Sequence, residues 1–114
     1  MSQYLLSMYY AQASADDVPA DISQIMERVA ALQARQIAAG AYVWGGGLLP
    51  AATARVVTAQ EDDEPLITDG PYLETHEAMG GFTIIEADSP EEAARWAEET
   101  SVAVGLPIEV RAFN

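Results

Sequence analysis

The single histidine of this chain, His76, lies in a short segment that is rich in carboxylates. Asp69 precedes it by seven residues, and Glu74 lies only two residues away. An imidazole beside a carboxylate can transfer protons near neutral pH, because the carboxylate fixes the tautomer of the ring. The segment therefore predicts an acid–base site, with His76 as the general acid or base and Asp69 or Glu74 orienting it.

The same residues also have structural interpretations. Asp69-Gly70-Pro71 is typical of a turn that the Asp carboxylate caps, and His76 would then be a surface residue on an acidic loop. A metal site would have to combine His76 with nearby carboxylates. A lone histidine without a second one at ligand spacing argues against that, so we expect neither a metal nor a cofactor.

Aromatic and arginine side chains are the candidates for holding a substrate. Tyr9 belongs to an aromatic-rich segment, where it could equally belong to the core or to a dimer interface. Arg111 is expected in a strand, where a buried guanidinium would need a carboxylate partner or an anionic ligand. We expect Tyr9, Tyr72 and Arg111 to contact a small substrate.

Composition limits the function classes further. The 114 residues provide one domain, spanning 1–114, with a formal net charge of −13. The five basic residues are scattered arginines, which argues against binding to nucleic acid or to anionic membranes. The absence of cysteine and lysine removes disulfides, thiolate nucleophiles and Schiff bases. Because no basic leader or spanning apolar run is present, we expect a cytoplasmic protein.

Alternating and helical patterns define the elements that must position these residues. Strands are predicted at 3–10, 41–44, 53–59, 66–68, 82–87 and 108–113. Asp21 and Ser89 are the predicted N-caps of two helices, of which the first spans about 21–39 and the second ends at Gly105. The acidic run 61–64 predicts a solvated hairpin turn, and residues 74–77 a short helical turn. Glycines 45–47 indicate a bulge or a close approach of backbones, since a phosphate-binding loop would need a Lys.

The order of elements is β-α-β-β-β-α-β, which predicts an α+β protein. Its core would be ferredoxin-like (βαββαβ), with a short extra strand at Leu66–Thr68. Two helices cover only one face of such a sheet, and the other face would carry apolar residues such as Leu5, Tyr9 and Phe113. A half-apolar open face favours a sheet-to-sheet homodimer, which would enclose a cavity lined by the polar residues of that face.

The segment from Ile67 to Phe82 is the most specific motif in the chain. It contains Thr68-Asp69-Gly70-Pro71-Tyr72 and, after Glu74-Thr75-His76-Glu77, a Gly80-Gly81-aromatic sequence. This resembles the signature of the YCII-related family in its DGPF-type branch, and the resemblance extends over roughly 37–113. Tyr72 replaces the usual phenylalanine of that signature, and His76 replaces the usual lysine.

The resemblance implies a dimeric α+β barrel and leaves the activity open. Similar proteins of the wider superfamily include cofactor-free isomerases and dehydrochlorinases, whereas others bind haem or act as oxygenases. Our first hypothesis is a cofactor-independent isomerase- or lyase-type enzyme that transfers protons on a small organic substrate. The alternative is a non-enzymatic dimeric module that binds a small ligand or a protein.

Overall fold

The structure is a computed structural model that describes residues 1–12, 18–73 and 75–114. Its elements follow one another along the chain as β1 (Ser2–Ala11), α1 (Ile22–Ala38), β2 (Tyr42–Gly47), the 3-10 turn η2 (Ala51–Thr53), β3 (Arg55–Thr58), β4 (Leu66–Asp69), β5 (Glu77–Ala87), α2 (Pro90–Val104) and β6 (Ile108–Ala112). None of the helices in these ranges is long and apolar enough to cross a bilayer.

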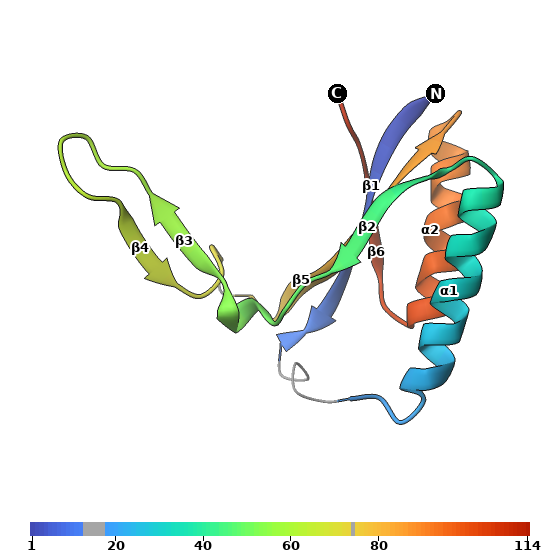
Figure 1. Cartoon of the computed structure of the whole chain (residues 1–114), viewed down its shortest axis with the longest axis horizontal. Coiled ribbons are helices and arrows are strands. Elements are labelled where there is room, and N and C mark those ends of the chain that lie inside the picture. The colour runs from blue at the N-terminus through green and yellow to red at the C-terminus, as the bar shows by residue number, and fades with distance from the viewer. Residues whose placement is uncertain (13–17, 74) are drawn as a thin grey trace.

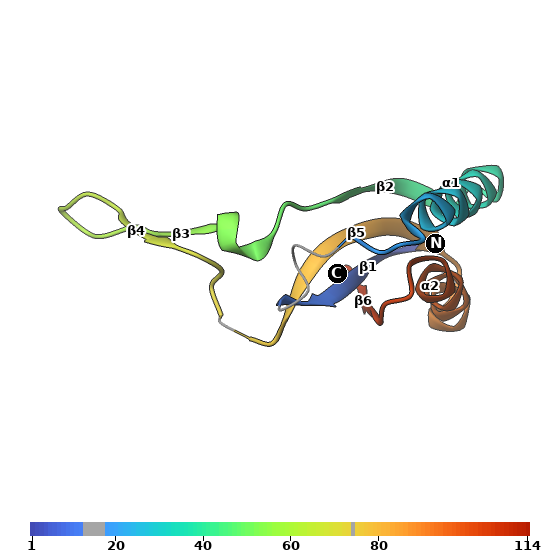
Figure 2. The same ribbon diagram turned by 90° about the horizontal axis from the view of Figure 1, so that it is seen from below.

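Four strands form the main sheet in the order β2-β5-β1-β6, and every neighbouring pair is antiparallel. Both helices lie on one side of this sheet, and the β3–β4 hairpin extends away on the other side (Figures 1 and 2). This strand order with two helices on one face confirms the predicted α+β class and is consistent with a ferredoxin-like fold.

The prediction was wrong about the extra strand. The 53–59 strand was expected in the core and only 66–68 as an insertion, but β3 and β4 pair with each other as a separate two-stranded sheet. The reason is that β5 begins five residues earlier than predicted, at Glu77, and pairs directly with β2. The whole hairpin is therefore the insertion, and the exposed acidic run 61–64 forms its turn, as predicted.

The early start of β5 also corrects the expected helical turn at 74–77. Glu77 is already extended and pairs with Ala11 of β1. Glu74 lies outside the described residues.

The two helix starts differ. The Ser89 hydroxyl accepts a hydrogen bond from the Glu92 amide (3.1 Å), and α2 ends at Gly105 in the left-handed conformation, both as predicted. Asp21 precedes α1 but makes no side-chain cap, because its backbone is not extended (φ −103°, ψ 27°). Its carboxylate lies instead 3.9 Å from the guanidinium of Arg28.

The core lies between the sheet and the helices, mainly α2. Its buried residues are Tyr4, Leu6, Ile85, Ala87, Ala93 and Ala97. The alternation predicted for β1 and β6 is confirmed, because Tyr4 and Leu6 face the helices, and Ile108 and Val110 pack against this cluster. Alanines on α2 let the helix approach the sheet closely.

The opposite face carries a band of apolar side chains and is not covered by a helix in the described ranges. Leu5 of β1 and Trp44 of β2 both lie opposite Ile84 of β5. The Trp44 ring meets Phe82 edge-on, with 5.2 Å between ring centroids. Trp44 and Phe113 remain exposed.

The core position of Leu6 gives a stability prediction. Leu6 is 1% exposed, so Leu6→Ala should leave a cavity and lower the free energy of unfolding by about 2–5 kcal/mol. Urea denaturation followed by circular dichroism measures this loss. Leu49→Ala removes the same atoms from a side chain that is 77% exposed and should change stability by less than about 0.5 kcal/mol. Equal losses in the two variants would contradict the assigned core.

Candidate functional site

The loop between β4 and β5 carries the signature residues and is held near both ends by hydrogen bonds. The Gly70 amide donates to the Ala54 carbonyl (2.8 Å) where the loop leaves the hairpin. Near the other end, the Gln12 amide donates to the His76 carbonyl (2.8 Å), and the Gln12 side chain donates to the Thr75 carbonyl (2.6 Å). The end of β1 therefore fixes the backbone that carries His76.

Asp69 and His76 line one recess of about 690 Å³, which we call the His76 recess. Its other walls come from Ala11 and Gln12 at the end of β1, Ala52, Gly70, Pro71 and Thr75. Two of the three predicted catalytic residues are thus brought to one hollow. The third, Glu74, lies outside the described residues.

Asp69 has a closer charged partner than His76 in the hairpin. Arg55 lies directly opposite it across β3 and β4, and the guanidinium Nε is 3.8 Å from Oδ1 of Asp69. The Asp69 side chain is 92% exposed, so this pair contributes little stability. His76 is also exposed. Both groups are therefore accessible to a molecule that enters the recess from solvent.

A second, mostly apolar hollow of about 810 Å³ adjoins the recess, and we call it the Tyr9 groove. Tyr9 and Tyr72, both predicted to contact a substrate, line it together with Leu48, Leu49 and Met79. Pro71 and Thr75 line both hollows, so the two are contiguous. A polar end with an imidazole and a carboxylate therefore continues into an apolar groove.

Tyr10, which the sequence did not single out, does not line the Tyr9 groove itself but holds Ala51, one of its lining residues. The Tyr10 hydroxyl accepts a hydrogen bond from the Ala51 amide (3.0 Å) in the segment after β2. A Cβ on Gly80 would lie 2.9 Å from the Tyr10 ring, so the ring packs directly on the backbone of β5. The Leu48 amide also donates to the Gly80 carbonyl (2.9 Å).

Arg111, the third predicted substrate contact, lies elsewhere on the same chain. It is opposite Leu5 in the β1–β6 pairing and lines a hollow of about 300 Å³ with Leu5 and Phe113. That position is four residues from Tyr9, roughly 13 Å along β1. Within one chain, Arg111 is therefore not part of the recess or the groove.

Leu48 and Leu49 were not predicted as groove residues. The signal available in the sequence was an apolar pair between three glycines and Pro50, outside any predicted strand. Exposed apolar side chains that form a contiguous patch can mark a surface that contacts a ligand or partner. Among the described residues, no cluster of three His, Asp or Glu side chains is arranged to hold a metal ion.

The arrangement suits a small organic molecule with an apolar body and one polar end. The groove would hold the body against Tyr9 and the leucines, and the polar end would reach His76 and Asp69. An imidazole exposed to such a molecule can accept or donate a proton without a metal.

The chain is similar to known proteins over most of its length. The YCII-related domain matches residues 2–111 of the chain. An uncharacterised protein of Rhizobium meliloti (strain 1021) is 31% identical over 80 residues, which cover 70% of this chain. The matched region spans 64% of that protein, so this chain corresponds to less than two thirds of its length.

The hydrogen bond of Tyr10 gives a matched pair of variants. Tyr10→Phe removes the acceptor of the Ala51 amide and should lower the free energy of unfolding by about 0.5–1.5 kcal/mol. Tyr72→Phe removes a hydroxyl from a side chain that is 83% exposed and should leave stability unchanged. Thermal or urea unfolding of the two variants measures the difference. If Tyr10→Phe is as stable as the wild type, Tyr10 does not hold the groove wall.

Proposed function

This chain belongs to the YCII-related family, and we propose that it is a cofactor-independent enzyme that transfers protons on a small organic substrate. The observation that carries the proposal is the placement of His76 and Asp69 in one recess that continues into the apolar Tyr9 groove. We assign the chain to the DGPF-type branch on the motif from Ile67 to Phe82, and we place it in the cytosol.

In the proposed reaction, His76 accepts a proton from an acidic carbon of the bound substrate. In an isomerisation the proton returns at another carbon. In an elimination the electron pair of the broken C–H bond forms a double bond, a leaving group on the neighbouring carbon departs with the electron pair of its own bond, and His76 passes the proton to solvent. Neither outcome requires an oxidant, a reductant or a cofactor. Asp69 is the proposed orienting carboxylate, and Glu74 keeps the same proposed role from the sequence. Tyr9 and Tyr72 hold the substrate body.

We further propose that a second copy of the chain completes the site. The helix-free face presents Leu5, Trp44, Phe82 and Ile84, and the hairpin extends on that same side (Figure 1). Burying such a band against a symmetric partner is favourable, because it removes apolar surface from water. Covering this face would also enclose Tyr9 and Arg111, so that Arg111 could bind the acidic end of a substrate.

The exposure of Asp69 and its pairing with Arg55 favour the alternative, a non-enzymatic binding module. In that case the signature loop is a structural turn and the groove binds a ligand without converting it. The two functions differ in whether His76 is needed for turnover or only lies beside the ligand.

The catalytic role can be tested because the chain has one histidine and therefore one set of imidazole resonances. Small aromatic acids, ketones and lactones are screened for saturable shifts of those resonances and for deuterium incorporation from D₂O. His76→Gln should lower deuterium incorporation at least 100-fold, because a general acid–base contributes about 10²–10⁴ to rate. Asp69→Asn should lower it less.

Asp63→Asn, the same change at the exposed hairpin turn, is the control and should keep full activity. Turnover that survives in His76→Gln would overturn the proposed role of His76. Saturable binding with no exchange by the wild type would support the binding module instead.

The dimer is tested by solution scattering at micromolar concentration, where the wild type should have twice the mass of one chain. Leu5→Glu places a charge in the helix-free face and should yield the monomer, because a buried unpaired carboxylate is costly. Val102→Glu, on the exposed side of α2 at 72% exposure, should remain dimeric. A wild-type mass of one chain would rule the dimer out.

A further inference from the structure

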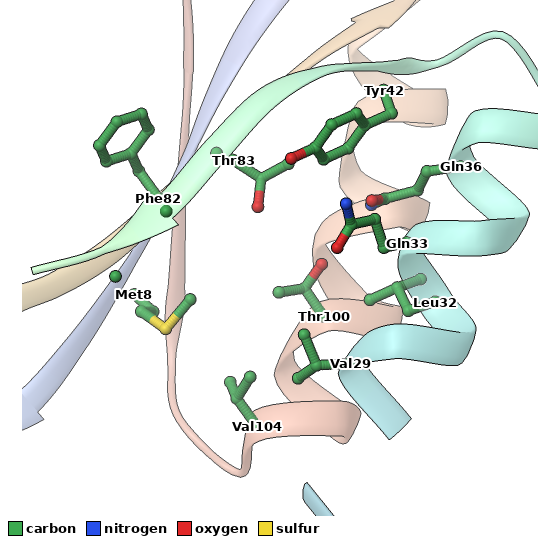
Figure 3. Close-up of a pocket in the computed structure, with 13 residues that line it drawn as sticks. Met8, Val29, Leu32, Gln33, Gln36, Tyr42, Phe82, Thr83, Thr100 and Val104 are labelled. Atoms are coloured by element: carbon green, nitrogen blue, oxygen red, sulfur yellow. The ribbon is translucent and has the colours of Figure 1, made fainter. Parts of the chain in front are cut away.

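A separate cavity of about 310 Å³ lies on the helix-covered side of the sheet, between α1, α2 and β2 (Figure 3). It lies on the face of the sheet opposite to the one that carries the apolar side chains of Leu5 and Trp44. It shares no lining residue with the His76 recess or the Tyr9 groove. We call it the α1 cavity. Because no residue is shared, binding of a molecule in this cavity can be tested independently of the proposed enzymatic function.

The cavity exists because the sheet has few side chains where the three glycines of β2 pair with β5. Gly45 and Gly47 of β2 lie opposite Thr83 and Gly81 of β5, and Thr83 shares the helix-facing side with Ile85. Gly45 cannot carry a side chain, because a Cβ there would lie 2.7 Å from the Phe82 carbonyl oxygen. At Gly47, by contrast, the nearest atom to a Cβ would be 4.0 Å away. The space over Gly47 is therefore open.

Polar side chains converge on this space from both walls. Gln33 and Gln36 of α1 direct their amides toward the sheet, and the hydroxyls of Tyr42 and Thr83 lie across from them (Figure 3). Gln36 is 3% exposed. None of the hydrogen bonds found among the described residues satisfies its side-chain amide, whereas Thr100 donates its hydroxyl hydrogen to the Trp96 carbonyl (2.8 Å).

The Gln36 amide is not sealed in the protein. Among the described residues, no side-chain nitrogen or oxygen is both inaccessible and without a hydrogen-bond partner. The polar atoms of Gln36 therefore reach the cavity, where a guest molecule can use them. Water in the cavity can hydrogen-bond these atoms, so a guest that displaces the water keeps the hydrogen bonds only if it carries a polar group that pairs with Gln36.

The remaining lining determines the class of guest. Met8, Val29, Leu32 and Val104 supply an apolar surface. None of the described residues that line the cavity has a side chain charged at neutral pH, so an ionic ligand would lose its hydration without gaining a counter-charge. Since a 150 Å³ cavity holds benzene, about 310 Å³ corresponds to a guest of roughly a dozen non-hydrogen atoms.

We propose that the α1 cavity is a second binding site, which takes a small neutral ring compound bearing an amide or hydroxyl group that pairs with Gln36. The ring packs on Met8, Leu32 and Val104. The amide or hydroxyl group meets Gln36 at the buried end, with Gln33, Tyr42 and Thr83 within the same polar cluster.

Benzamide is the probe, and benzoate is its charged counterpart of the same size. In side-chain NMR spectra of the full chain, benzamide should saturably shift the amide resonances of Gln36 and the methyl resonance of Met8. Benzoate should bind at least tenfold more weakly. Toluene, which keeps the ring and lacks the polar group, should also bind more weakly than benzamide.

Gly47→Val fills the cavity from the sheet side and should weaken benzamide binding at least tenfold. Gly46→Val is the matched control. The Gly46 backbone lines the cavity, but residue 46 pairs with Phe82, whose ring points away from the cavity (Figure 3), and a Cβ at residue 46 meets nothing within 4 Å. Gln36→Leu keeps the volume and removes the amide, so it should abolish the preference for benzamide over toluene. If Gly47→Val fails to fold, Gln36→Leu still tests the proposal.

The proposal is overturned if benzamide gives no saturable shift in the wild type. It is also overturned if folded Gly47→Val binds benzamide as the wild type does, or if Gln36→Leu retains the preference for benzamide over toluene.

Discussion

The antiparallel pairing of β1 with β5 is the interaction on which the rest of the structure depends. These are the two central strands of the main sheet, paired from Ser2–Ala87 to Ala11–Glu77. Each also holds an edge strand, β6 on β1 and β2 on β5. Their helix-facing residues form the core, and their far ends fasten the signature loop through Gln12 and His76. A single ladder therefore serves both stability and the candidate site.

One irregularity in that ladder determines the shape of the Tyr9 groove. Met8 lies opposite Gly81, but Tyr9 lies opposite Met79, so Gly80 is an extra residue on β5. The bulge places the Met79 side chain across from Tyr9 and leaves Gly80 beneath the Tyr10 ring. With regular pairing, a glycine would stand opposite Tyr9, and the groove would lack Met79 on that wall.

The parts of the fold that local patterns specify were predictable. Alternation along β1 and β6 identified the core face, and Ser89-Pro90 with Glu92 identified the start of α2. Strand pairing was harder to predict, because a short strand such as Arg55–Thr58 can pair with several others equally well. Its partner is decided by the length of β5, which reaches β2 directly and leaves β3 to pair with β4. For the site, the motif placed Asp69 and His76 close in sequence. Tyr10 and Gln12 act through hydrogen bonds across the chain, which no spacing rule reveals.

The pairing of β6 with β1 has a consequence for how the chain folds. The two strands are separated by about a hundred residues of sequence, and the Phe113 amide donates to the Gln3 carbonyl at the outer end of the ladder (2.9 Å). Closing so long a loop is entropically expensive and slows folding. During synthesis the outer edge of β1 stays unpaired until β6 has left the ribosome. Over that interval, the mutual repulsion of chains that carry a net charge of −13 opposes edge-to-edge aggregation.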